Sequence, residues 1–101
     1  MIRFIAPHIE TMLDTREENR YKPSDVARYM MKGLPIGGVM QVRAGMTLLL
    51  EVLRVKNQTY QITQYKAIGE RSDLYKQSTL SVRPAIDAVA KAVEAIERSD
   101  I

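Results

Sequence analysis

The sequence predicts an α+β domain in which helices are followed by a β-hairpin and a C-terminal helix. Residues 84–98 carry an apolar stripe at helical spacing, and residues 59–66 are rich in Thr, Tyr and Ile, as in a half-exposed strand. The glycine of Ala44-Gly45-Met46 lies between two apolar segments, where a turn is needed. A chain of 101 residues fits a single domain, 1–101, with one modest core.

The first third of the chain is expected to contribute two helices. Pro7 fits the first turn of a helix and apolar residues follow it at helical spacing, which predicts a helix over residues 7–18. Pro23 is typical of a helix start, and Gly33 of a left-handed cap that ends one. These two residues predict a second helix over 23–32.

The central stretch, residues 36–66, has two interpretations. As helices over 36–43 and 47–55, it aligns five apolar residues on one stripe: Val39, Val42, Met46, Leu49 and Leu53. As a three-stranded antiparallel meander, it puts apolar residues on both faces of segment 47–55, which is demanding for so small a domain. The straight-chain residues Met, Leu, Glu and Arg favour the helical interpretation.

The last third of the chain is expected to complete the fold. Residues 59–66 and 74–82 alternate well enough to pair as a hairpin, joined by a polar loop at 69–73. The helix over 84–98 has five alanines, which permit close packing against another helix. That helix is predicted to pack in the core or, as the alternative, to form a homodimer contact.

Composition excludes several classes of function. The chain has no cysteine, which excludes disulfides and thiolate metal sites, and no run that approaches the roughly 20 apolar residues of a membrane span. His8 is the only histidine, and Gly37-Gly38 lacks the lysine and hydroxyl residue of a phosphate-binding loop. We therefore expect a cytoplasmic, non-catalytic protein with no cofactor and no bound metal.

The positive charge is concentrated in the middle of the chain. Residues 21–66 carry seven basic and two acidic side chains, whereas residues 1–20 and 67–101 each have one more acidic than basic side chain. The net charge of +3 therefore comes from the central segment. Such an asymmetry indicates an anionic partner.

The order of helix, helix, turn, helix and two strands resembles the winged helix-turn-helix family of DNA-binding proteins. The resemblance covers residues 23–82 and rests on AGMT at Ala44–Thr47, LEVLR at Leu50–Arg54 and YQIT at Tyr60–Thr63. It implies that the helix after the turn lies in the major groove of double-stranded DNA, while the hairpin touches the backbone. The residues that the resemblance places at DNA are Arg43, Thr47, Glu51, Arg54, Lys56 and, in the wing tip, Arg71.

Two functions follow from these patterns. The first is a small, dimeric DNA-binding regulator of transcription. The alternative is a small protein-binding inhibitor or adaptor, of phage or plasmid type, that occludes a partner surface through its excess of apolar residues: Leu48–Leu50, Met30, Met31, Met40 and Met46. Burial of the three leucines and a helical fold would favour the first function, and a dominant sheet would favour the second.

Overall fold

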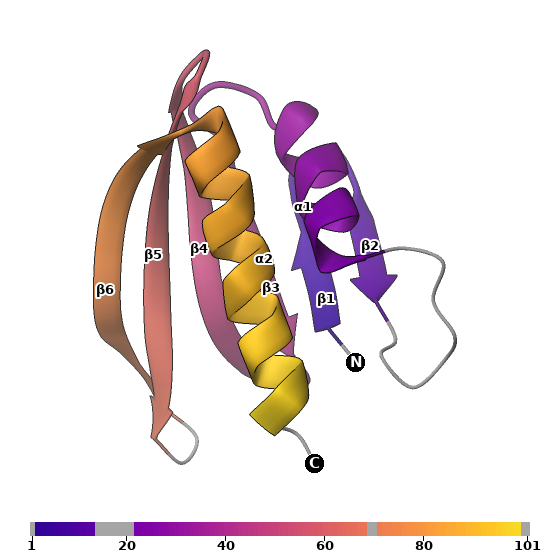
Figure 1. Cartoon of the computed structure of the whole chain (residues 1–101), viewed down its shortest axis with the longest axis vertical. Coiled ribbons are helices and arrows are strands. Elements are labelled where there is room, and N and C mark those ends of the chain that lie inside the picture. Colours follow the sequence, from indigo (N-terminus) through magenta and orange to yellow (C-terminus); the bar gives the residue numbers. More distant parts are fainter. Residues whose placement is uncertain (1, 14–21, 69–70, 100–101) are drawn as a thin grey trace.

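The computed structural model describes residues 2–13, 22–68 and 71–99, and over these residues the protein is predominantly β (Figure 1). Six strands form one antiparallel sheet in the order β2-β1-β3-β4-β5-β6. The elements in chain order are β1 (Ile2–Ile5), β2 (Glu10–Leu13), α1 (Pro23–Lys32), β3 (Val39–Ala44), β4 (Thr47–Lys56), β5 (Thr59–Ile68), β6 (Arg71–Ser81) and α2 (Val82–Ser99).

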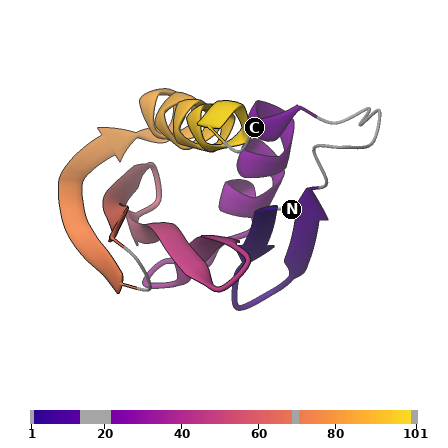
Figure 2. The same ribbon diagram turned by 90° about the horizontal axis from the view of Figure 1, so that it is seen from below.

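The two helices lie on one face of the sheet. Figure 2 shows that the strands curve around α1 and α2, so that the concave face is covered by the helices. Within the described part of the chain, no element covers the opposite face, which is called the open face below. The predicted winged-helix-like arrangement is therefore wrong, because a β-meander occupies the place of the predicted helix-turn-helix.

The meander runs through β3 to β6 and corrects both central helices. Segment 47–55, predicted as a helix, is β4, and most of segment 36–43 is β3. Burial alternates with a period of two in both strands, which is the spacing of a sheet. Met46, a member of the predicted helical stripe, is 92% exposed. The predicted turn is confirmed: Gly45 has a φ of +60°, and the two-residue loop joins paired residues Ala44 and Thr47.

The predicted helix over 7–18 is also wrong. Residues 10–13 form β2, which pairs with β1 as an antiparallel hairpin, and the Ala6 amide donates to the Ile9 carbonyl in the connecting loop. The rest of that prediction, residues 14–18, lies outside the described residues. Helical spacing failed here because Met12, part of the expected apolar stripe, is 60% exposed, and so short a segment is decided by its pairing with β1.

The remaining elements confirm the sequence predictions. Helix α1 spans the predicted residues 23–32, β5 contains 59–66, β6 covers nearly all of 74–82, and α2 contains 84–98. The cap differs from expectation, since Gly33 has a φ of −85° and is not left-handed. A Cβ at Gly33 would lie 2.7 Å from Nε2 of His8, so the imidazole closely approaches this glycine.

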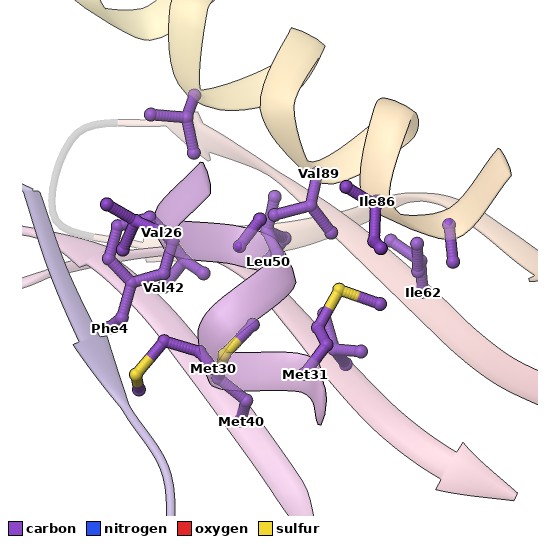
Figure 3. Packing of buried hydrophobic residues seen from close by; sticks show 14 of the residues in the cluster. Phe4, Val26, Met30, Met31, Met40, Val42, Leu50, Ile62, Ile86 and Val89 are labelled. Carbon is purple, nitrogen blue, oxygen red and sulfur yellow. The ribbon is translucent and has the colours of Figure 1, made fainter. Parts of the chain in front are cut away.

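The core lies between the helices and the concave face of the sheet (Figure 3). Three of the methionines that were predicted to form an adaptable contact surface, Met30, Met31 and Met40, are at most 1% exposed and fill this core. The apolar stripe of α2 also packs inside it, through Ile86 and Val89 among others. The stripe therefore packs in the core of its own chain, which is the first of the two roles predicted for this helix.

Candidate functional site

The six residues placed at DNA by the resemblance are spread over the sheet. Arg43 and Glu51 lie on the open face, whereas Arg54 lies on the helix-covered side beside Tyr60. Thr47 and Lys56 are at opposite ends of the ten-residue strand β4, about 30 Å apart at the usual rise per residue. Arg71 pairs with Ile68 at the end of the β5–β6 hairpin away from Lys56, and its side chain lies outside the described ones. The five of these residues whose side chains are described therefore do not converge on one site.

Arg54 joins two loops. Its NH1 donates to the Leu34 carbonyl at 2.7 Å, and its NH2 donates to the backbone oxygen of Asn57 at 2.7 Å and to Oδ1 of Asn57 at 2.9 Å. The guanidinium lies 5.8 Å from the centre of the Tyr60 ring. These contacts connect the α1–β3 loop to the β4–β5 turn, and they occupy the side chain that the resemblance placed at DNA.

A cleft opens beside Arg54, where the C-terminal half of α1, the first turns of α2 and the β4–β5 turn meet. Its volume is about 570 Å³. Four basic side chains and a single acidic one line it: Arg28, Lys32, Arg54, Arg83 and Asp87. We call this site the cationic cleft.

The basic residues of the cationic cleft differ in how they are held. Arg28, Lys32 and Arg83 are exposed, and none of their side chains makes an ion pair or a hydrogen bond with another described residue. Asp87 stands one helical turn after Arg83 but forms no ion pair with it. The cleft therefore combines one fixed guanidinium with three cations that are available to a ligand.

The open face of the sheet carries a chain of polar contacts centred on Glu51. The hydroxyl of Tyr65 donates to Oε1 of Glu51 at 2.5 Å, and Nε2 of Gln41 approaches Oε2 at 3.5 Å. Nε of Arg43 in turn donates to Oε1 of Gln41 at 3.1 Å. Glu51 and Tyr65 also line a shallow hollow of about 410 Å³ together with Leu53. This face therefore combines a bonded polar network with apolar side chains, among them Val39, which is 39% exposed, and the half-buried Leu53.

The contact with Glu51 predicts an alkaline titration for Tyr65. The hydrogen bond to Glu51, then burial and then the carboxylate charge raise the pKa of Tyr65 above its ordinary value of 10.0. A raised pKa stabilises the fold below the unfolded-state value, and that contribution is lost as pH rises through the folded-state value. The stability difference between the wild type and Tyr65→Phe should therefore shrink at alkaline pH.

The measurement is a spectrophotometric phenolate titration, in which subtraction of the Tyr65→Phe curve isolates Tyr65. Glu51→Gln serves as the control, because it removes the charge and should return the pKa of Tyr65 toward its ordinary value. A wild-type Tyr65 that titrates together with the other tyrosines would contradict the contact.

The two edges of the sheet differ in length. Among the described residues, β2 and β6 are the outer strands, with four and eleven residues respectively. The short edge β2 carries the ion pair between Arg3 and Glu10, whose NH2 and Oε1 atoms are 2.6 Å apart. The long edge β6 lies at the margin of the molecule in Figure 1, with no described element beyond it.

No metal-binding group of three or more His, Cys, Asp or Glu side chains occurs among residues 2–13, 22–68 and 71–99. In the same residues, no helix has the length and hydrophobicity needed to cross a membrane. Comparisons with protein-family models, curated proteins and solved structures found no match.

In the sequence, Arg28 and Lys32 count toward the positive central segment, but no role was predicted for them or for Arg83. Their four-residue spacing did show that Arg28 and Lys32 share one side of α1. The missing information was that α2 begins beside the C-terminal half of α1, which depends on the whole meander between them.

Proposed function

We propose that this chain is a small, non-catalytic protein-binding module that takes an extended segment of a partner protein along the free edge of β6. The observation that carries this proposal is the edge itself. An edge strand presents a row of unpaired backbone N–H and C=O groups, and these groups recognise an added strand through main-chain hydrogen bonds.

The edge of β6 lacks two of the features that block strand addition, short length and proline. It is eleven residues long and contains no proline. Its sequence has three charged residues, Arg71, Asp73 and Lys76, all within its first six residues, so the stretch from Gln77 to Ser81 carries no charge. Proteins protect exposed edges with short strands, prolines and several charges. The opposite edge, β2, fits that protected pattern better, because it is four residues long and carries the carboxylate of Glu10.

The meander also changes the balance between the two functions predicted from the sequence. The resemblance implied that a helix over 47–55 would enter the major groove, but this segment is a strand in the middle of the sheet. Of the three leucines, Leu50 is fully buried while Leu48 and Leu49 are half-buried. A dominant sheet favours the protein-binding alternative, and the buried core favours strand addition over docking on exposed methionines.

The side chains of β6 indicate the kind of segment that fits. Gln77 and Thr79 lie on the open face, where Nε2 of Gln77 donates to Oγ1 of Thr63 at 3.0 Å. Lys76 and Leu80 lie on the helix-covered side, paired with Gln64 and Tyr60. Because opposite charges on directly paired residues stabilise a sheet, an acidic residue facing Lys76 should favour binding.

The test is photo-crosslinking in the cells that produce the protein, with the photoreactive residue at Thr79 and, as a matched exposed control, at Ala95 of α2. The captured partner segment is then added to the pure protein, and amide hydrogen exchange is measured. Successive amides of an edge strand alternate between β5 and solvent, so strand addition should protect every second amide of β6.

Ser78→Pro and Thr79→Pro provide the matched variants. One of these two neighbouring amides faces outward, so one proline should keep the pairing with β5 and abolish partner binding. A bound partner that protects other elements and leaves β6 exchanging freely would rule the proposal out. Protection that rises with protein concentration alone would instead assign the edge to a second copy of the chain, and would also overturn it.

A further inference from the structure

We propose that the cationic cleft binds a phosphate group of a phosphate-bearing ligand. The cleft lies between the helices and the β4–β5 turn, whereas the proposed protein-binding site is the outer edge of β6. The inference therefore stands independently of the proposed function. Inorganic phosphate, a nucleotide and a nucleic-acid backbone share the relevant chemistry, and the probes described below separate them.

The cleft gathers positive charge from segments far apart in the sequence. Arg28 and Lys32 come from α1 and Arg83 from the first turn of α2, more than fifty residues later. Ligand-binding clefts usually enclose about 300–1,000 Å³, and this one has a volume of about 570 Å³. The fold thus builds a concave site of ligand size with cations on two of its walls.

The charges of this site are not balanced within the described protein. Like charges brought together by folding repel one another, and this repulsion is relieved when an anion binds between them. Asp87 is the one acidic residue of the cleft lining, and it makes no ion pair with the neighbouring Arg83. The lining therefore favours a ligand that carries more than one negative charge.

The donor groups fit phosphate better than a single carboxylate. The guanidinium groups of Arg28 and Arg83 offer planar pairs of N–H donors, and Lys32 adds a point charge. Oδ1 of Asn57 accepts from Arg54, so the Asn57 amide nitrogen remains available as a further donor. One arginine can satisfy both oxygens of a carboxylate, whereas phosphate has enough acceptor oxygens for several donors.

The site also provides apolar surface beside the cations. Val82 lines the cleft and is 37% exposed, while the deeper apolar residues Met31 and Tyr60 are at most 2% exposed. A ligand's phosphate would meet the cations near the rim, and its organic part could cover Val82. The floor is closed by buried side chains, so the ligand enters from the solvent side.

The experiment measures binding of four probes to the intact protein at low and moderate salt. The probes are inorganic phosphate, adenosine monophosphate, a single-stranded oligonucleotide and duplex DNA, and an oligoglutamate peptide serves as the anionic control. Amide NMR shifts report whether each probe contacts residues 28–32 and 82–87. We expect salt-sensitive binding of at least one phosphate probe at these residues.

Two triple variants separate the cleft from general charge. Arg28→Gln/Lys32→Gln/Arg83→Gln removes the available cations of the cleft, and Lys22→Gln/Lys76→Gln/Lys91→Gln removes the same charge from exposed positions outside its lining. Loss of one charged hydrogen-bonding partner usually weakens binding about tenfold. The first variant should therefore weaken phosphate binding at least a hundredfold by the same arithmetic, and the second much less.

Asp87→Asn tests the site in the opposite direction. It removes the one carboxylate of the lining, so phosphate affinity should rise a few-fold, by about the strength of one exposed charge interaction. Binding of free phosphate alone would identify a small anion as the ligand, and tighter binding of an oligonucleotide would identify nucleic acid. The proposal is overturned if no phosphate probe binds at low salt, if oligoglutamate binds more tightly, or if both triple variants lose affinity equally.

Discussion

Replacing Leu50 with alanine is expected to lower the free energy of unfolding by about 2–5 kcal/mol. Leu50 is fully buried at the centre of β4, where it pairs with Val42 on one side and Gln64 on the other. The shortened side chain would leave a cavity beneath the helices, and a packed core only partly relaxes around such a cavity. Equilibrium denaturation in urea, followed by circular dichroism, measures the loss.

Leu53→Ala is the matched control for this prediction. Leu53 lies three residues further along the same strand, but on the open face, where it is half-buried. Its truncation leaves no enclosed cavity, so we expect a loss of about 1 kcal/mol or less. The helical interpretation of segment 47–55 predicts the reverse order, because it places Leu53 on the buried stripe. A larger loss for Leu53→Ala than for Leu50→Ala would therefore contradict the sheet.

The same leucines explain why the sequence favoured a helix in the middle of the chain. Helix propensity differs by only a few tenths of a kcal/mol between most residues, and pairing with two neighbouring strands overrides so small a preference. An apolar residue on each face seemed costly for a strand in a small domain. The structure resolves this because Leu50 and Val52 fill the core and Leu49 packs against it, while Leu53 stays half-buried on the open face.

The elements predicted correctly are those whose signals are local. Pro23 at the start of α1, the positive φ of Gly45 in the turn and the apolar stripe of α2 each depend on residues within one or two turns of chain. The cationic cleft depends instead on the contact between α1 and α2, which are separated by four strands. The sequence therefore showed that positive charge is concentrated in the central segment, but it could not show that Arg83 lies close to that segment in the fold.

The resemblance placed Arg54 at DNA, whereas the structure shows it bonded to Leu34 and Asn57 within the protein. The variant Arg54→Met tests whether the residue has this structural role. We expect a loss of about 2–4 kcal/mol of unfolding free energy, because three hydrogen bonds from a charged group disappear and the carbonyl of Leu34 loses its donor. Methionine has a similar length and keeps part of the apolar packing against Tyr60. Thermal and urea denaturation of the full chain measure this change.

Arg54→Lys separates the charge of this residue from its geometry. A lysine ammonium keeps the positive charge in the cationic cleft but cannot reach Leu34 and Asn57 at once with a planar fork of donors. We therefore expect Arg54→Lys to recover less than half of the stability lost in Arg54→Met. If lysine restored full stability, the positive charge alone would account for the contribution of Arg54. The hydrogen bonds from Arg54 to Leu34 and Asn57 would then not be needed to hold the α1–β3 connection against the β4–β5 turn.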